Sequence, residues 1–211
     1  YSYSRRKNLY VVLPTGVMDD ENNLIKENMT SVFVDYSRQI AKLSLQLGLR
    51  YEHVDFNYYE HDVRVDAQSK RYADWFPSFA LSFPVNKVQM QLAYASNISR
   101  PSYQMLRSGV QYDNRVTYES GNPFLLPSIS RNLSYSLSWK WISFSAMFAR
   151  ISNKICPIMQ PYKGDPTATL MRPENMPTYN KMQTSLSLSP SFGVWHPSLE
   201  AMFYKQWFKM N

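Results

Sequence analysis

Side chains that could do chemistry are scattered along this sequence rather than grouped. His53, His61 and His196 stand far apart, whereas a metal site needs two or more ligands at a defined spacing. The acidic run at 19–21 lacks the glycine and the spacing of an EF-hand loop, and neither neighbour of Cys156 activates its thiol. There is no Gly-x-Ser-x-Gly elbow and no glycine-rich phosphate loop. The sequence therefore predicts no enzyme, no metal site and no cofactor.

The strongest candidate for contact with a ligand is the long stretch 100–129. It mixes aromatic rings with charged and amide groups, which gives an adaptable contact surface, and long loops are often functional. The alternative is a lid that covers the fold without binding anything. The predicted ligand contacts are Tyr103, Arg107, Tyr112, Arg115, Tyr118 and Phe124.

The charge of the chain does not indicate a nucleic-acid partner. The 211 residues carry 23 Lys and Arg against 16 Asp and Glu, a formal net charge of +7. The densest basic cluster is only Arg5-Arg6-Lys7, and no block of five or six basic residues occurs. We therefore predict no nucleic-acid binding.

The elements that must position these loops are strands. In 131–148, "RNLSYSLSWKWISFSAMF", apolar residues alternate with serine and then change phase after Lys140 and Trp141. A period of two indicates a strand with two unlike faces, and the change of phase indicates a hairpin. Similar alternation or short apolar runs predict about nine strands in an all-β antiparallel meander. The other segments are 9–13, 31–36, 43–52, 75–83, 88–98, 184–192 and 199–207.

The predicted connections alternate between two lengths. Short ones fall at 37–41, 84–87, 139–141 and 193–197, and long ones at 14–29, 57–71, 100–129 and 156–176. In a meander this places every long loop at the same rim. Short turns at one rim and long loops at the other are typical of an outer-membrane β-barrel.

The two faces of the strands fit a barrel better than a soluble sheet. The polar face carries small uncharged residues such as Ser134, Ser136 and Gln91, whereas exposed faces of soluble sheets usually carry many charges. Aromatic residues near both strand ends suit interfacial belts, although a sandwich core would also use them. No run of eighteen apolar residues predicts a membrane helix, but a barrel strand needs only about ten residues of alternation.

Two motifs resemble a known family. Arg100-Pro101-Ser102 ends one predicted strand, and Gly121-Asn122-Pro123, with Leu125 and Pro127, precedes the next. Together with the strand pattern over most of 30–211, they resemble the late barrel portion of TonB-dependent outer-membrane receptors, most closely the Bacteroidetes outer-membrane β-barrel family. One departure is Ser128, where the family usually has glutamate.

The resemblance implies that residues 1–211 are part of a transmembrane β-barrel domain in the outer membrane of a Gram-negative bacterium. It implies uptake of a nutrient ligand, and as partners the outer-membrane lipid, the rest of the barrel with its plug, and the TonB complex through the plug region. No plug domain, TonB box or signal peptide is recognisable within these residues. Two other functions stay open, a passive porin or structural barrel and a soluble carbohydrate-binding β-sandwich.

Overall fold

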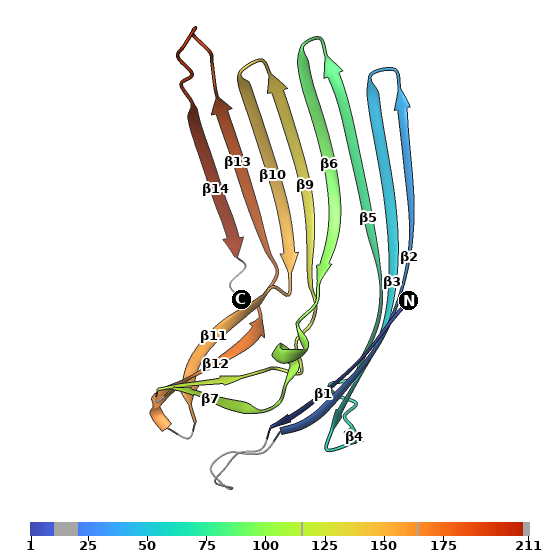
Figure 1. Cartoon of the computed structure of the whole chain (residues 1–211), viewed down its shortest axis with the longest axis vertical. Coiled ribbons are helices and arrows are strands. Elements are labelled where there is room, and N and C mark those ends of the chain that lie inside the picture. Colours follow the sequence, from blue (N-terminus) through green and yellow to red (C-terminus); the bar gives the residue numbers. More distant parts are fainter. Residues whose placement is uncertain (11–20, 115, 164, 209–211) are drawn as a thin grey trace.

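One antiparallel sheet forms most of the molecule (Figure 1). The computed structural model describes residues 1–10, 21–114, 116–163 and 165–208. The strands of the main path pair in chain order, and a short strand, β4 (Val63–Arg64), adds to β3. The predicted antiparallel meander is confirmed. Its strands are β1 (Ser2–Tyr10), β2 (Glu21–Ile40), β3 (Leu43–Glu60), β5 (Lys70–Val85), β6 (Val88–Ser99), β9 (Ser128–Trp139), β10 (Ile142–Ser152), β13 (Tyr179–Leu188) and β14 (Leu199–Phe208).

The short connections lie together at one rim of the sheet (Figure 1). Three of them are two-residue turns, and the first residue of each, Ala41, Asn86 or Lys140, has a φ of 51°, 57° or 50°. A positive φ at this position belongs to the tight hairpin turns that match strand twist. The fourth connection, 189–198, joins β13 to β14 at the same rim. The predicted placement of these four connections at one rim is therefore confirmed, although the fourth is longer than the expected turn at 193–197.

The register confirms that the apolar residues share one face of the sheet. Leu45 pairs with Leu81, which also pairs with Leu92, and Leu137 pairs with Phe144. Directly opposed residues project to the same side. We call the face that carries these residues the outer face. The opposite, inner face carries the polar row Ser44, Ser82, Gln91, Ser136, Ser145 and Ser185.

The aromatic residues of the outer face gather near its two ends. Trp139 ends β9 beside the short-turn rim and is exposed, as is Trp141 in the turn that follows. Toward the long-loop rim, Tyr51 and Trp75 pair across β3 and β5 with ring centroids 4.7 Å apart. This placement is typical of the aromatic belts at membrane interfaces.

A second, four-stranded sheet lies at the long-loop rim (Figure 1). Its order is β11 (Ile155–Tyr162), β12 (Asp165–Asn175), β8 (Thr117–Ser120) and β7 (Val110–Asn114), and β8 pairs in parallel with β12. A 3-10 helix, η1 (Tyr103–Leu106), precedes it. The stretches 100–129 and 156–176, expected to be irregular, are therefore largely ordered. Among the described residues, no helix is long and apolar enough to cross a membrane.

Strands β2 and β3 run well beyond the lengths expected. The expected loops 14–29 and 57–71 begin or end inside these strands, and the strand expected at 9–13 is instead Ser2–Tyr10. Residues 11–20 lie outside the described part. The error on β3 has a physical cause, because its apolar alternation switches faces. Its apolar residues up to Tyr51 lie on the outer face, whereas Val54, Phe56 and Tyr58 belong to the inner face and are buried. The outer-face set is Leu43, Leu45, Leu47, Leu49 and Tyr51.

Candidate ligand-binding site

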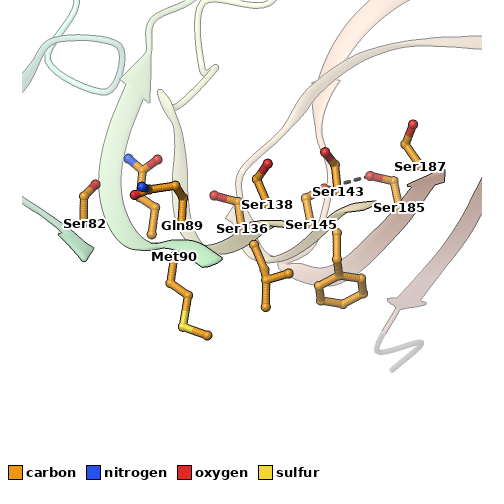
Figure 2. Close-up of a pocket in the computed structure, with 12 residues that line it drawn as sticks. Ser82, Gln89, Met90, Ser136, Ser138, Ser143, Ser145, Ser185 and Ser187 are labelled. Atoms are coloured by element: carbon orange, nitrogen blue, oxygen red, sulfur yellow. Dashed lines mark hydrogen bonds between the residues drawn. The ribbon is translucent and has the colours of Figure 1, made fainter. Parts of the chain in front are cut away.

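The inner face offers a wall of hydroxyl and amide groups. A hollow of about 430 Å³ is lined by serines and glutamines of five neighbouring strands. Figure 2 shows the labelled serines projecting into it, while Met90 points to the other side of the sheet. Ser145 and Ser185 lie within hydrogen-bond distance, 2.8 Å between their Oγ atoms. Because each hydroxyl can donate and accept, this wall can face water or another polar surface.

Nearer the long-loop rim, the inner face becomes charged and aromatic. Phe33, Asp35, Arg50 and Phe76 line a second hollow of about 310 Å³. The guanidinium carbon of Arg50 lies 5.1 Å from the centre of the Phe76 ring, within cation–π range. Gly48 keeps this wall open, because a Cβ at this position would lie 2.5 Å from Ser78 Oγ.

A buried carboxylate ties the segment after β6 to the wall. Glu52 is only 6% exposed and accepts a hydrogen bond from Arg100, and Arg50 Nε lies 3.1 Å from its other oxygen. A buried carboxylate needs such partners, because an unpaired charge there would be very costly. Arg100 of the Arg-Pro-Ser motif therefore fixes the start of the long loop. Ser102 continues the attachment by capping η1 through the Met105 amide.

The Gly-Asn-Pro motif fastens the other end of the same loop. Gly121 has no room for a side chain, since a Cβ would lie 2.4 Å from the carbonyl oxygen of Arg107. Asn122 is buried and donates through Nδ2 to the Pro173 carbonyl and the Glu174 carboxylate, both at 3.0 Å. Its Oδ1 accepts from the Phe124 amide. The motif therefore joins the loop to β12.

A small apolar core lies between this loop and the inner face. Leu106 and Leu125 come from the loop, and they pack against Ile25, Val54, Phe56 and Tyr58 of β2 and β3. Lys70 Nζ adds a hydrogen bond of 2.7 Å to the Leu125 carbonyl. The loop is thus folded inward over the wall and held by burial of apolar surface.

Two titratable groups, Glu27 and Lys70, border this core. Both lie on the long-loop side of Tyr51 and Trp75, beyond the apolar part of the outer face. Burial raises the pKa of Glu27 above its ordinary value, although Arg100 and a hydrogen bond with Tyr103 lower it in part. Burial also lowers the pKa of Lys70. Both shifts follow from the removal of a charged group from water.

Tyrosines connect the two long loops within the four-stranded sheet. The Tyr118 ring stacks on Tyr162 at 4.3 Å between centroids, and Tyr112 meets Tyr118 edge-on at 5.7 Å. Asn175 adds polar links, with Nδ2 donating to the carbonyls of Leu126 and Asn153 and Oδ1 accepting from the Leu126 amide at 2.7 Å. The loops are therefore joined into one unit.

The structure gives the predicted ligand contacts different surroundings. Tyr112 is 56% exposed and Phe124 is 53% exposed, so both rings are accessible. Tyr118 is half-buried between Tyr112 and Tyr162. Tyr103 is half-buried beside the apolar core.

Arg107 is the deepest of the predicted contacts. It is 6% exposed, donates to Gln111, and lies 3.8 Å from the Glu119 carboxylate. Arg115 lies outside the described residues. Which of the six residues contact a ligand stays a prediction.

Sequence reasoning missed three residues that build this region. Glu52 and Asn175 looked like ordinary polar residues, and Tyr162 lay in a separate predicted loop. The pairing of β8 with β12 brings Tyr162 to Tyr118 across more than forty positions of sequence. Of these three residues, only Glu52 could have been noticed in the sequence, because it is a carboxylate on the polar face of a regular predicted strand.

The described residues do not group their histidines, cysteine and carboxylates into a metal site. His53 Nε2 lies 3.3 Å from Asp55, His61 lies in the turn after β3, and His196 contacts Ser191. Asp19 and Asp20 lie outside the described part.

A single-layer sheet with an uncovered apolar face, a polar inner face and long loops at one rim defines the wall of an outer-membrane β-barrel. The chain belongs to the outer membrane protein beta-barrel family, which matches residues 10–211. Its place is therefore the outer membrane of a Gram-negative bacterium. A soluble β-sandwich would cover the apolar face with a second sheet, and the described residues place none there.

Solved structures share this fold. The chain is similar to the FrpB iron transporter from Neisseria meningitidis, with a TM-score of 0.55 and 12% identity over 90% of this chain and 26% of that one. The hemophore receptor HasR of Serratia marcescens gives a TM-score of 0.58 and 15% identity, over 90% and 35% of the two chains. The siderophore receptor PirA of Pseudomonas aeruginosa gives 0.52 and 10%, over 88% and 44%.

These similarities establish the fold alone. The chain spans between 26% and 44% of the length of these three structures. No curated protein matches the sequence.

Proposed function

We propose that this chain forms part of the wall and extracellular loops of a TonB-dependent receptor that takes up a nutrient ligand. The observation that carries the proposal is the loop 100–127, which is folded inward and joined to β11 and β12 above a polar inner wall. A built extracellular surface over a hydrated wall suits capture of a ligand before passage. The rest of the barrel, the plug and the contact with the TonB complex would belong to other parts of the parent protein.

The solved relatives are named for iron, haem-carrier and siderophore traffic. We carry over only the class, a scarce nutrient, because identities of 10–15% do not transfer a ligand. Within that class, Tyr112 and Phe124 are the proposed ring contacts, since both are exposed on the loop unit. Tyr103, Arg107 and Tyr118 are more buried and would hold the loop that carries these two rings.

Uptake by whole cells tests this proposal. Cells that carry or lack the parent gene are given labelled ferric siderophores, haem and oligosaccharides, with and without a protonophore. The proposal expects gene-dependent uptake of one ligand class that stops when the proton gradient is removed. Gene-dependent passage that survives the protonophore would instead favour a passive porin.

A matched pair of variants then tests the loop surface. Tyr112→Ala and Phe124→Ala should weaken ligand capture by about tenfold each, in line with loss of an aromatic contact of about 1–1.5 kcal/mol. Trp141→Ala at the opposite rim is the control and should leave capture unchanged. Capture that is equal in all three variants would count against this surface.

A further inference from the structure

Two arginines face each other directly on the outer face of the sheet. Arg131 of β9 pairs with Arg150 of β10. Both are exposed, and both follow the outer-face phase of Leu133 and Phe148, which form the adjacent pair. Like charges opposed across neighbouring strands destabilise a sheet unless something neutralises them.

The described strands supply no carboxylate for this pair. β6, β9, β10 and β13 contain no Asp or Glu, and the one acid of β14, Glu200, pairs with Ser187 near the opposite rim. Neither arginine forms an ion pair among the described residues, whereas the outer-face Arg71 is bonded to Asp55. The two positive charges therefore require an anion from outside the wall.

The position of the pair indicates the kind of anion. Eight residues separate each arginine from the short turn at 140–141. Because a strand needs about ten residues to span the membrane, both arginines lie near the long-loop end of their strands. Immediately toward the membrane interior, the row Leu133, Phe148 and Met182 is apolar. An anion that contacts both the arginine pair and this apolar row must have a charged head and acyl chains.

Neighbouring side chains extend the same surface. Asn180 pairs with Arg150, and Trp207 pairs with Asn180, so an amide and an indole continue the row. Lys205 adds a cation one row nearer the membrane interior, with Nζ 5.3 Å from the Trp207 ring centre. Arginine suits phosphate in particular, because its planar fork donates two parallel hydrogen bonds.

We propose that Arg131 and Arg150 form a binding site for the phosphate of an outer-leaflet lipid, with the acyl chains lying on Leu133 and Phe148. This inference goes beyond the proposed uptake and holds whatever the transported ligand is. The site anchors a lipid to the outside of the wall at the height of the long loops.

Lipid binding to the complete parent protein, purified in detergent, tests the site. The probes are a diphosphorylated glycolipid, its dephosphorylated counterpart and inorganic phosphate, and bound lipid is counted by native mass spectrometry. The diphosphorylated lipid should bind, and Arg131→Gln with Arg150→Gln should weaken it about thirtyfold, from two lost surface cations. Arg131→Lys with Arg150→Lys keeps both charges but loses the paired hydrogen bonds of the guanidinium, so binding should fall between that of the unaltered protein and that of the double glutamine variant. Arg71→Gln should have no effect.

Three results would overturn the proposal. They are equal binding of phosphorylated and dephosphorylated lipid to the unaltered protein, full displacement of the lipid by millimolar inorganic phosphate, and unchanged lipid binding in the double glutamine variant. The first two need no variant, so the test stands even where the double substitution impairs folding.

Discussion

At the scale of single residues, the two family motifs act as fasteners of the loop 100–127. Arg100 pairs with buried Glu52, and the side-chain amide of Asn122 donates hydrogen bonds to β12. Neither residue is free for a ligand, so their role in this chain is to hold the surface on which Tyr112 and Phe124 are exposed. Motif residues of this kind mark the architecture of a site rather than its contacts.

Gly121 gives the sharpest test of this role. Gly121→Ala places a Cβ within 2.4 Å of the Arg107 carbonyl oxygen and 2.8 Å of its amide nitrogen. Backbone atoms cannot yield as a side chain can, so we expect a loss of about 1–3 kcal/mol in loop stability. Limited proteolysis of the extracellular loops in the complete protein should show faster cleavage.

Gly48→Ala is the matched control. Its Cβ would meet Ser78 Oγ and Asp35 Oδ1, the ends of side chains that can rotate away. Cleavage should stay at the level of the unaltered protein. Equal acceleration in both variants would show that loop stability does not depend on the close approach at Gly121.

Glu27 adds a dependence on pH. Because burial raises its pKa, the ionised form is disfavoured in the folded protein. Stability contributed by this group is fully present below the ordinary carboxyl pKa and is lost as pH rises through the raised pKa. Glu27→Gln should therefore be more stable than the unaltered protein at neutral pH and equal to it in acid. Thermal unfolding of the complete protein at the two pH values measures this, and a difference that does not change with pH would argue against it.

At the scale of elements, the sequence predicts the membrane part of the sheet well and the extracellular part poorly. From Leu133 to Trp139 on β9 and from Ile142 to Ala146 on β10, one solvent contacts each face, so the alternation of serine and apolar residues is regular. On β3 the loop 100–127 covers the inner face beyond Glu52, so Val54 and Phe56 are buried there. Nearer the short-turn rim, the same face of β3 is polar. A local pattern cannot reveal which distant segment will cover it.

The same reason explains the missed four-stranded sheet. β11 and β12 contain Pro157, Pro161 and Pro173, which argue against regular strands in sequence. Tertiary pairing of β12 with β8 and the stack of Tyr118 on Tyr162 stabilise them instead. Of the candidate site, sequence could indicate the loop and its aromatic rings, but not their partners in 155–175.

The two faces of a strand should respond differently to charge. Leu92 lies on the outer face at the middle of the wall, between Leu81 and Tyr135, and Gln91 lies on the inner face opposite Ser82 and Ser136. Leu92→Arg should impair assembly, since an arginine facing lipid near the midplane costs about 2–4 kcal/mol. Gln91→Arg should be tolerated, because it points into the hydrated interior. Heat-modifiable migration on gels reports folding, and similar defects in both variants would contradict the assignment of the faces.

At the scale of the whole molecule, the sheet has two open edges. Among the described residues, β1 and β14 each pair on one side only, with β2 and with β13. β14 is exposed along its whole length, including Phe203 and Trp207, and carries no proline. Natural edge strands usually carry protective features, and an unpaired edge in lipid leaves backbone groups unsatisfied at several kcal/mol each. Both edges therefore need partner strands.

Closure decides what these residues can do on their own. Among the described residues, the main path of the sheet has nine strands, whereas bacterial single-chain barrels have even counts. We therefore expect that residues 1–211 alone, refolded with lipid, form no closed barrel and conduct no ions, because neither edge has a partner. Planar-bilayer recordings of this segment, beside the complete parent protein refolded in the same way, make the comparison. Stable conductance from the segment alone would mean that β1 and β14 can satisfy each other, and that the wall described here is sufficient for a pore.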